Sequence, residues 1–299
     1  MTTTLPTTTS EINAEWLTEA LRESGTIGAG TAVASVVFDP GAAGVGFMGE
    51  VGKVGLVYEG DATDAPTSVI AKFPTHSPEV AAMMHPTRIY EREHRFYAEL
   101  APKSSLRTPA IYHVTCETAA APEDERYLLL MEDLSSLTLG DQLAGLSVEQ
   151  AEHALVALAA HHATFWGGAG LEAADFVPVI NGPLNQAGAA IYDASLPGFM
   201  EAFGHVIQPE LEAYVAGYAA VRGQILDDLE AMPHTLVHFD YRAATLLFDT
   251  DGSVAVVDWQ TTSEGAGAED VGYLLTQNLT VDDRRAHETD LLRSYHDAL

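Results

Sequence analysis

The stretch LVHFDYRAATLLFD at residues 236–249, followed by VAVVDWQ at 254–260, decides which fold the chain is expected to adopt. Both stretches combine short apolar runs, typical of buried strands, with a few polar residues. Asp258 ends the run VAVV, where a carboxylate is costly to bury unless it meets a cation. A simple cap at the end of a strand is the alternative for Asp258. Together with Asp240, it indicates a site where carboxylates and a cation converge.

The first stretch follows the order of a kinase catalytic loop, H-R-D-x-x-x-x-N, in which the Asp positions an acceptor hydroxyl and the Asn holds a metal ion. His238 and Asp240 match this order, and with Arg242 they are the candidate catalytic residues. Asp258 matches the further metal-binding Asp on a nearby strand. Thr245 stands in place of the Asn, and its short hydroxyl is a poorer magnesium ligand, although Ser or Thr holds magnesium in P-loop enzymes. Asp258 and Thr245 are therefore the candidate metal ligands.

A glycine-rich stretch, GVGFMGEV at residues 44–51, fits the pattern G-x-G-x-x-G-x-V of loops whose backbone N–H groups approach phosphates. Gly44, Gly46 and Gly49 are the candidate phosphate-contacting residues. A dinucleotide-binding turn uses similar glycines, but a helix must follow it, and here the strand-like sequence VGKVGLVY follows. A glycine hairpin that binds nothing is the other alternative.

Lysine is scarce in this chain, and Lys72 lies in the apolar sequence SVIAKF at residues 68–73. It resembles the lysine of the V-A-I-K strand that holds nucleotide phosphates. A lysine among apolar residues needs an anionic partner or must lose its charge. Glu93 on the following predicted helix is the first choice of partner, and Glu91 is the second. A solvated lysine on an edge strand is the alternative.

These motifs together resemble the aminoglycoside phosphotransferase and choline kinase superfamily, in particular its ecdysteroid kinase-like branch, from about residue 30 to the C-terminus. The resemblance implies ATP, Mg²⁺ and phosphoryl transfer to a hydroxyl of a small molecule. REHRFYAEL, from residue 92, resembles the helix that carries the lysine's partner. LLLMEDL, from residue 128, resembles the hinge that receives adenine, so Met131, Glu132 and Leu134 are candidate cofactor contacts.

Two residues depart from the pattern of this family. Phe239 stands where the family usually has Gly, and Thr245 stands where it has the metal-binding Asn. Asp270, in EDVGYLL, matches a family Asp that supports the catalytic loop. The loss of the Asn leaves two possibilities, an active small-molecule kinase and a catalytically impaired pseudokinase that only binds its ligands. A third possibility, which does not depend on the Asn, is an NAD-linked enzyme that uses the same glycines.

The order of the elements predicts an α+β fold with a small antiparallel β-sheet lobe and a mainly helical second lobe. The resemblance implies that this is the two-lobed fold of the protein kinase type. Residues 1–29 are expected to form a tail and a helix. Residues 30–133 are expected to form the nucleotide-binding lobe, and residues 134–299 the catalytic and acceptor-binding lobe.

Several helices are expected. They run from Ser10 to near Gly25, over 87–100, from Ser147 with a capping box to Gln150, over 197–206 and over 208–231. His161 and His162 are about 100° apart around their helix, so they do not form a chelating pair, and one of them is expected in the core. The aromatic pair Phe96 and Tyr97 is also expected in the core rather than at a ligand.

The composition limits the partners. Among 299 residues, 43 are acidic and 14 are basic, and the formal net charge of −29 would repel nucleic acid and anionic membranes. Cys116 is the only cysteine, so an intrachain disulfide is excluded. No stretch approaches the roughly 18 apolar residues of a membrane helix, and a cytoplasmic monomer or homodimer is expected.

The acceptor is expected to be a small molecule that resembles an aminoglycoside, choline or a sterol. Its pocket is expected among helices between about residues 180 and 230, where apolar residues mix with Glu201, Glu210 and Glu212. This mixture is compatible with an apolar alcohol or a cationic amine.

Overall fold

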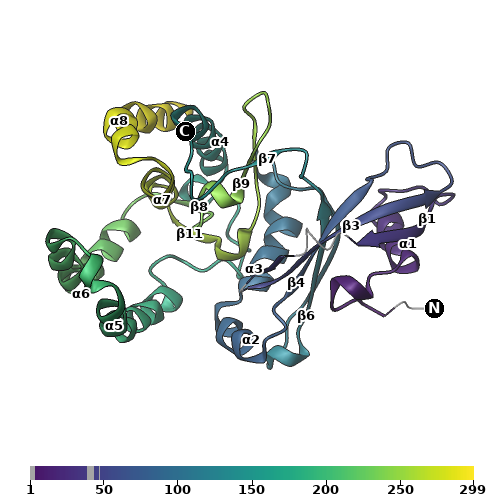
Figure 1. Ribbon diagram of the computed structural model, residues 1–299, viewed down its shortest axis with the longest axis horizontal. Coiled ribbons are helices and arrows are strands. Elements are labelled where there is room, and N and C mark those ends of the chain that lie inside the picture. The colour runs from purple at the N-terminus through teal and green to yellow at the C-terminus, as the bar shows by residue number, and fades with distance from the viewer. Residues whose placement is uncertain (1–3, 39–43, 47) are drawn as a thin grey trace.

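The computed structural model describes residues 4–38, 44–46 and 48–299, which form two lobes (Figure 1). One lobe is built on an antiparallel sheet and is called the sheet lobe. The other is mainly helical and is called the helical lobe. The predicted α+β fold with a small antiparallel sheet and a mainly helical second lobe is confirmed.

The sheet lobe contains a six-stranded antiparallel sheet with the order β1-β3-β4-β6-β5, in which β2 pairs with β3. The strands are β1 Ala32–Phe38, β2 Gly44–Gly46, β3 Gly49–Glu59, β4 Ser68–Pro74, β5 Ile111–Glu117 and β6 Arg126–Glu132. β6, whose central residues Tyr127 to Met131 are buried, lies inside the sheet between β4 and β5. β4 is also an interior strand, with Lys72 opposite Val51 on one side and Leu129 on the other. The edge-strand alternative for Lys72 is therefore excluded.

The two faces of the sheet carry different helices because side chains alternate along each strand. Leu128 and Leu130 of β6 pack with Trp16 and Leu17 of α1, which spans Ala14–Glu23. Leu129 of β6 belongs instead to the core that contains the π-helical turn Phe96–Leu100. This turn continues α3, Ile89–Arg95, and the predicted helix at 87–100 therefore begins two residues later than expected.

The start of α1 also differs from the prediction. Asn13, not Ser10, is the N-cap, and its side chain accepts a hydrogen bond from the Trp16 N–H. Ser10 lies in a short 3₁₀ turn before the helix. A further helix, α2 Pro78–Met84, is capped by Ser77 and was not expected from the sequence. It is only seven residues long, which is too short for a clear helical period in the sequence.

The helical lobe has five α-helices and two small sheets. The helices are α4 Val148–Thr164, α5 Pro183–Phe203, α6 Pro209–Glu230, α7 Ala268–Asn278 and α8 Val281–Ala298. The strands are β7 Thr138–Leu139, β8 His234–Val237, β9 Leu246–Phe248, β10 Val254–Val256 and β11 Ser263–Ala266. One sheet has the order β10-β9-β7, and the other pairs β11 with β8.

The predicted capping box between Ser147 and Gln150 at the start of α4 is confirmed. The prediction for α5 was wrong, because the helix starts at Pro183 and continues through Pro197. A proline favours the first turn of a helix, and two prolines in one helix make the start ambiguous from the sequence. Figure 1 shows α5 and α6 as a helical pair that projects from the rest of the helical lobe.

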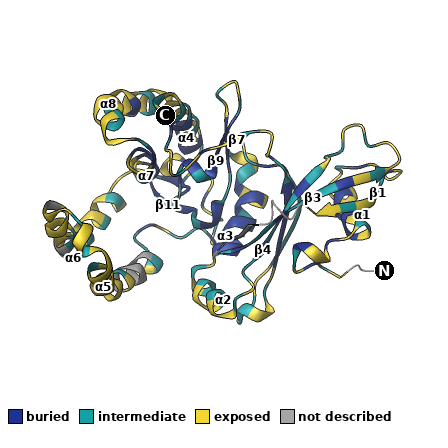
Figure 2. Ribbon diagram, viewed as in Figure 1, coloured by how far each residue is buried: buried dark blue, intermediate teal, exposed yellow. Residues whose placement is uncertain are grey.

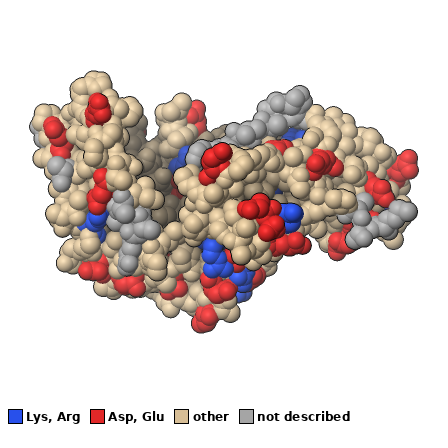
Figure 3. All heavy atoms as spheres, turned by 90° about the horizontal axis from the view of Figure 1, so that it is seen from below, with Lys and Arg blue, Asp and Glu red and all other residues tan. Residues whose placement is uncertain are grey.

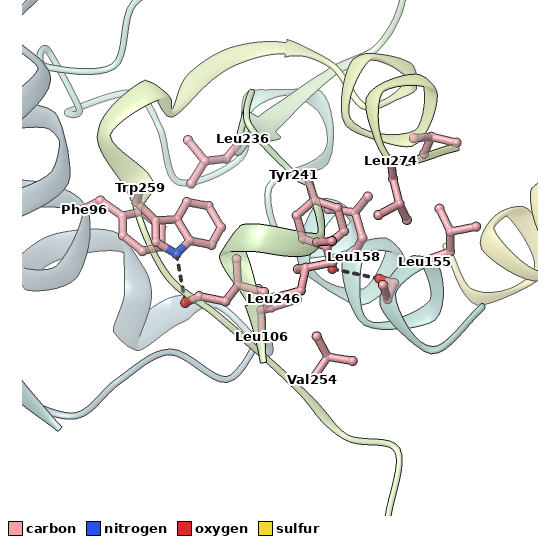
Figure 4. Close-up of a cluster of buried hydrophobic side chains, with 14 of the residues drawn as sticks. Phe96, Leu106, Leu155, Leu158, Leu236, Tyr241, Leu246, Val254, Trp259 and Leu274 are labelled. Carbon is pink, nitrogen blue, oxygen red and sulfur yellow. Dashed lines mark hydrogen bonds between the residues drawn. The ribbon is translucent and has the colours of Figure 1, made fainter. Parts of the chain in front are cut away.

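The main core joins the two lobes. Phe96 from the sheet lobe stacks on Trp259 from the helical lobe, with ring centroids 3.8 Å apart (Figure 4). Both rings are fully buried, and Figure 2 shows the buried residues concentrated where α3 meets the short strands. Tyr241 lies in the same cluster and donates its hydroxyl to the carbonyl of Ala154 on α4, 2.9 Å away.

The structure corrects the expectation for the histidines of α4, because both His161 and His162 are fully buried. His161 bonds to the Ser104 hydroxyl through Nδ1 and to the Leu236 carbonyl through Nε2, at 2.7 and 3.0 Å. It therefore ties α4 to β8. Burial lowers the pKa of His161 from 6.5 to about 3, since the charged imidazolium would lose its hydration.

This shift predicts how stability depends on pH. The unfolded chain binds a proton at His161 below pH 6.5, whereas the folded chain does so only near pH 3. Stability is therefore lost as the pH falls below 6.5, by up to about 1.4 kcal/mol per pH unit. We expect His161→Gln to remove this part of the slope, measured by urea unfolding between about pH 6 and 4.

His287→Gln, at an exposed position on α8, is the control and should keep the slope of the wild type. If His161→Gln and the wild type give parallel profiles, then His161 does not resist protonation in the folded chain.

Candidate active site

Lys72 lies at the centre of a charged cluster built from three distant parts of the chain. Its Nζ is 2.7 Å from Glu93 Oε1 on α3 and 2.9 Å from Asp258 Oδ1, which follows β10. Glu93 is therefore the partner, as predicted, and Glu91 instead pairs with Arg88 and Arg95. The structure thus brings together three of the residues that the sequence singles out.

The electrostatics of this cluster keep Lys72 charged. Burial alone would lower the pKa of Lys72, but the carboxylates of Glu93 and Asp258 outweigh it and raise the pKa to about 12. Burial raises the pKa of Glu93 to about 7, although Lys72 acts in the opposite direction. Burial likewise opposes ionisation of Asp258, but Lys72 lowers its pKa below the ordinary value. Lys72 therefore stays positively charged, and its charge lowers the pKa of Asp258 and opposes the rise in the pKa of Glu93.

Asp258 has an unusual backbone conformation that turns its carboxylate toward Lys72. Its φ is +69°, in the left-handed region that non-glycine residues rarely adopt. The buried Trp259 follows it and is anchored in the core. Within the described chain, the Asp258 side chain makes no capping hydrogen bond to the following turn. The alternative of a simple strand-end cap therefore does not hold, and the strain points to a functional role.

The catalytic-loop candidates form a network that connects with this cluster. His238 is fully buried, its Nε2 lies 3.0 Å from the Val257 carbonyl, and its Nδ1 accepts from the Asp240 N–H at 3.2 Å. With Nδ1 accepting, Nε2 is the nitrogen that donates. His238 thus holds Asp240 beside the strand end that carries Asp258. Arg242 Nε donates to Asp240 Oδ1 at 2.8 Å, so Arg242 orients the carboxylate.

The carboxylate of Asp270 holds the loop at residues 238–245 by accepting hydrogen bonds from the backbone of that loop. Its two carboxylate oxygens accept from the N–H groups of His238 and Phe239, each at 2.7 Å, and it also contacts His162 Nε2 at 3.3 Å. Burial alone would raise the pKa of Asp270, but the hydrogen bonds from His162 and the backbone lower it.

Phe239 has φ +67°, which explains why a glycine suits this position.

Thr245, the second candidate metal ligand, is turned into the loop. It is 2% exposed, and its hydroxyl lies 3.0 Å from the carbonyl oxygens of both Asp240 and Arg242. The hydroxyl also accepts from the Arg242 N–H at 3.3 Å. These contacts use the oxygen to close the loop, so Thr245 acts as a structural link in this state.

A cavity of about 650 Å³ lies between the lobes, next to the charged cluster. Lys72, Glu93 and Asp258 line it, together with the hinge candidates Met131, Glu132 and Leu134. Its apolar walls come from Val51, Ile70, Tyr97, Leu137, Leu139 and Leu247. This volume and lining are typical of a site for a small organic molecule.

Sequence reasoning missed two contributors to this cavity. Tyr97 was expected in the core, and it is buried, but it also lines the cavity. Asp133 follows the hinge strand and pairs with Lys53 of β3 at 2.7 Å, which ties the hinge to the sheet. The sequence signal for this pair is weak, because an Asp at a lobe connector resembles an ordinary turn residue.

The glycine candidates lie in the hairpin between β2 and β3, where Gly44 pairs with Val51 and Gly46 pairs with Gly49. Phe47 lies outside the described residues. A Cβ at Gly49 would come within 2.3 Å of the Phe73 carbonyl oxygen, so close strand packing requires this glycine. A strand rather than a helix follows the glycines, which argues against a dinucleotide-binding turn. Contact with phosphates stays a prediction.

None of the helices in the described part of the chain combines the length and the apolar character needed to cross a membrane. In the same part of the chain, no cluster of three or more His, Cys, Asp or Glu side chains is arranged to hold a metal ion. Any divalent ion at Asp258 would therefore need further oxygen ligands from a bound molecule or water.

The role of Asp270 gives a prediction about stability. We expect Asp270→Asn to lower the free energy of unfolding by about 2–3 kcal/mol, because an amide nitrogen would face backbone N–H donors and leave one unsatisfied. Urea unfolding at neutral pH measures this change. Asp290→Asn, on the exposed surface of α8, should change stability by less than about 0.5 kcal/mol. Equal effects of the two substitutions would contradict the assigned role.

Comparison with solved structures shows the same fold in several kinases. A putative aminoglycoside phosphotransferase from Ralstonia eutropha is 19% identical, with a TM-score of 0.55 over 96% of this chain and 80% of its own. Amicoumacin kinase, solved in complex with AMP-PNP and Ca²⁺, is 12% identical, with a TM-score of 0.56 over 87% and 72%. The type I macrolide 2′-phosphotransferase is 16% identical, with a TM-score of 0.52 over 99% and 84%.

No protein of curated function matches the sequence. The family pattern, in contrast, covers most of the chain. Residues 43–299 match the ecdysteroid kinase-like family, and this range includes Lys72, Glu93, the loop at 238–245 and Asp258. The predicted resemblance is confirmed, and the chain belongs to the ecdysteroid kinase-like family.

Proposed function

We propose that this protein is an ATP-dependent phosphotransferase that transfers the γ-phosphoryl group to a hydroxyl of a small molecule. The observation that carries the proposal is the ion-paired Lys72, held by Glu93 and Asp258 at the edge of the cavity of about 650 Å³. A fixed cation beside an acidic side chain suits a triphosphate and a divalent ion. Membership of the ecdysteroid kinase-like family supports the same activity.

The nucleotide would occupy this cavity with its base toward the hinge. Met131, Glu132 and Leu134 line that part of the cavity beside the apolar walls. The N–H of Glu132 already donates to the Ala110 carbonyl at 2.8 Å, and the carbonyl of Leu134 accepts from the Leu137 N–H at 2.9 Å. The N–H of Leu134 is therefore the donor proposed for adenine. The complex of amicoumacin kinase with AMP-PNP supports ATP as the donor.

Asp258 fits the role of magnesium ligand. Its side chain is 41% exposed, lines the cavity, and offers a carboxylate oxygen, the ligand type that Mg²⁺ prefers. A bound Mg²⁺ would neutralise phosphate charge during transfer. Lys72 would hold the phosphates in place, and Asp240 would accept or orient the proton of the acceptor hydroxyl. Arg242 and His238 would position Asp240 through the hydrogen bonds described above.

The acceptor is proposed to be an apolar alcohol. The α5–α6 pair, where the acceptor pocket is expected, exposes large apolar side chains at Ile191, Phe199, Phe203, Val206, Leu211 and Tyr214. An exposed apolar patch on a helical pair is typical of a surface that binds an apolar partner. A sterol-like molecule suits this surface better than an aminoglycoside does.

A second candidate function is that of a pseudokinase, and Thr245 favours it. Its hydroxyl is engaged inside the loop, so the protein would offer one metal-binding carboxylate in place of a carboxylate and an amide. Such a protein would bind nucleotide without turning it over.

We further propose that the lobes divide near residue 133, with residues 1–29 as an N-terminal tail and helix, and the packing of this helix, α1, on the sheet supports its place in the sheet lobe. We also propose a cytoplasmic monomer or homodimer. The surface supports the expectation that nucleic acid and membranes are not partners, because acidic side chains outnumber basic ones on the face in Figure 3.

The first test addresses Asp240. We expect Asp240→Ala to reduce turnover by roughly 100-fold or more, with little change in ATP affinity, because the carboxylate acts on the acceptor and not on the nucleotide. ATP consumption with Mg²⁺ is measured across amino sugars, choline-like amines and sterol-like alcohols, and ATP affinity is measured by calorimetry.

Asp290→Ala on α8 is the matched control and should behave as the wild type. Unchanged turnover in Asp240→Ala would remove Asp240 from the proposed mechanism.

The second test separates the two candidate functions through Thr245. We expect turnover in the wild type, and we expect Thr245→Asn to lower the free energy of unfolding by about 1–2 kcal/mol, because the loop loses its hydroxyl contacts. Thr245→Ser keeps the hydroxyl and should retain most of the stability. Turnover that appears only in Thr245→Asn would instead identify the natural chain as a pseudokinase.

A further inference from the structure

Arg92 on α3 is a buried cation with very few partners. It is 4% exposed, and its one hydrogen bond is a long one, 3.4 Å from Nη1 to the Thr262 carbonyl. Among the described residues, its Nε has no hydrogen-bond partner and its guanidinium forms no ion pair. The neighbouring Arg88 and Arg95 both pair with Glu91, so the lack of an anion is particular to Arg92.

The burial of the Arg92 guanidinium without a counter-ion is energetically unfavourable. Burial, together with the nearby charge of Arg88, lowers the pKa of Arg92 to about 10. A pKa of about 10 still leaves the guanidinium protonated at neutral pH. A buried charge without a counter-ion is costly, and proteins with such a charge usually have a partner for it.

Arg92 lines a second cavity, of about 660 Å³, between the start of α3 and the segment that leads into α5. Most of its lining is apolar and comes from Pro86, Phe176, Pro178, Val179, Pro183 and Leu184. The described residues that line it all differ from those that line the cavity at Lys72.

The other charged residues of this cavity are already paired. Arg88 bonds to both carboxylate oxygens of Glu91, at 2.6 and 2.7 Å. Asp175 is an exposed carboxylate at the rim and bonds to Arg95 at 2.7 Å. An anion that enters this cavity would therefore meet the guanidinium of Arg92, which has no ion-pair partner among the described residues. The walls around this guanidinium are mostly apolar.

We propose that this cavity binds a small molecule with an anionic group, a carboxylate or a phosphate monoester, on an apolar body. The anionic group pairs with the part of the Arg92 guanidinium that lines the cavity, since Arg is the side chain best suited to carboxylate and phosphate groups. The apolar body lies against Phe176 and Val179. The site is independent of the proposed phosphotransfer, because it needs neither ATP nor Asp240.

The test is made on the full chain without nucleotide, by calorimetric titration with four eight-carbon probes. Octanoate and octyl phosphate represent the two sources of the anionic group, 1-octanol lacks the charge, and octylamine reverses it. We expect at least one anion to bind about tenfold or more tightly than 1-octanol, and octylamine not to bind. The stronger of the two anions identifies the group that the site prefers.

Arg92→Met keeps the length of the side chain and removes the charge. We expect it to reduce the affinity for the anion to that of 1-octanol and to raise the thermal midpoint, because an unpaired buried charge is removed. Arg293→Met, on the exposed surface of α8, is the control and should change neither quantity. Val179→Trp, at a residue that is 37% exposed, fills the apolar part and should weaken both anions.

Three results would overturn the proposal. One is that neither anion binds better than 1-octanol. Another is that Arg92→Met lowers the thermal midpoint while anion affinity is unchanged, which would make Arg92 a structural link to Thr262. The third is that Val179→Trp leaves anion affinity unchanged, which would place the ligand elsewhere.

Discussion

The ion-paired ammonium of Lys72 is the interaction on which the geometry of the cleft depends. It joins β4, α3 and the end of β10, which lie in both lobes and are far apart in the sequence. Glu93 and Asp258 would otherwise be two like charges near each other in a poorly hydrated place, which is unfavourable. Removing one member of such a group leaves the others uncompensated. The positions of α3 and of the Asp258 turn are therefore coupled through a single cation.

The loop at residues 238–245, in contrast, is held by hydrogen bonds to its backbone. Asp270 accepts from two consecutive N–H groups, and His238 bridges the loop to the strand that ends at Asp258. This support allows Phe239 to keep a left-handed conformation that is normally unfavourable for a bulky residue. The side chain of Asp240 is then positioned by this backbone frame together with its hydrogen bond from Arg242. Such a frame is what phosphoryl transfer requires, since its catalysis is mostly positioning.

The sequence predicted the charged residues of the site better than its walls. Lys72 and Asp258 were found because a charge among apolar residues demands a partner, and this demand is visible in the sequence. Glu93 was found because it lies on the predicted helix that follows the strand of Lys72. Tyr97 was missed because an aromatic residue in a helix has the same pattern whether it faces the core or a cavity. Arg92 was also missed, because its lack of a partner depends on what lies nearby in space. The start of α5 was placed too late because Pro197 resembles a first-turn proline.

The charge balance of the site limits how a nucleotide could enter it. Three acidic side chains, of Glu93, Asp240 and Asp258, face two basic ones, of Lys72 and Arg242. Without a further cation, the phosphates of a nucleotide would meet a site that is not positive overall, in a protein that is already strongly acidic. A divalent ion at Asp258 reverses this sign, so nucleotide and ion are expected to bind together. Because the Thr245 hydroxyl is engaged in the loop, binding of the divalent ion by the protein would depend on the carboxylate of Asp258 alone.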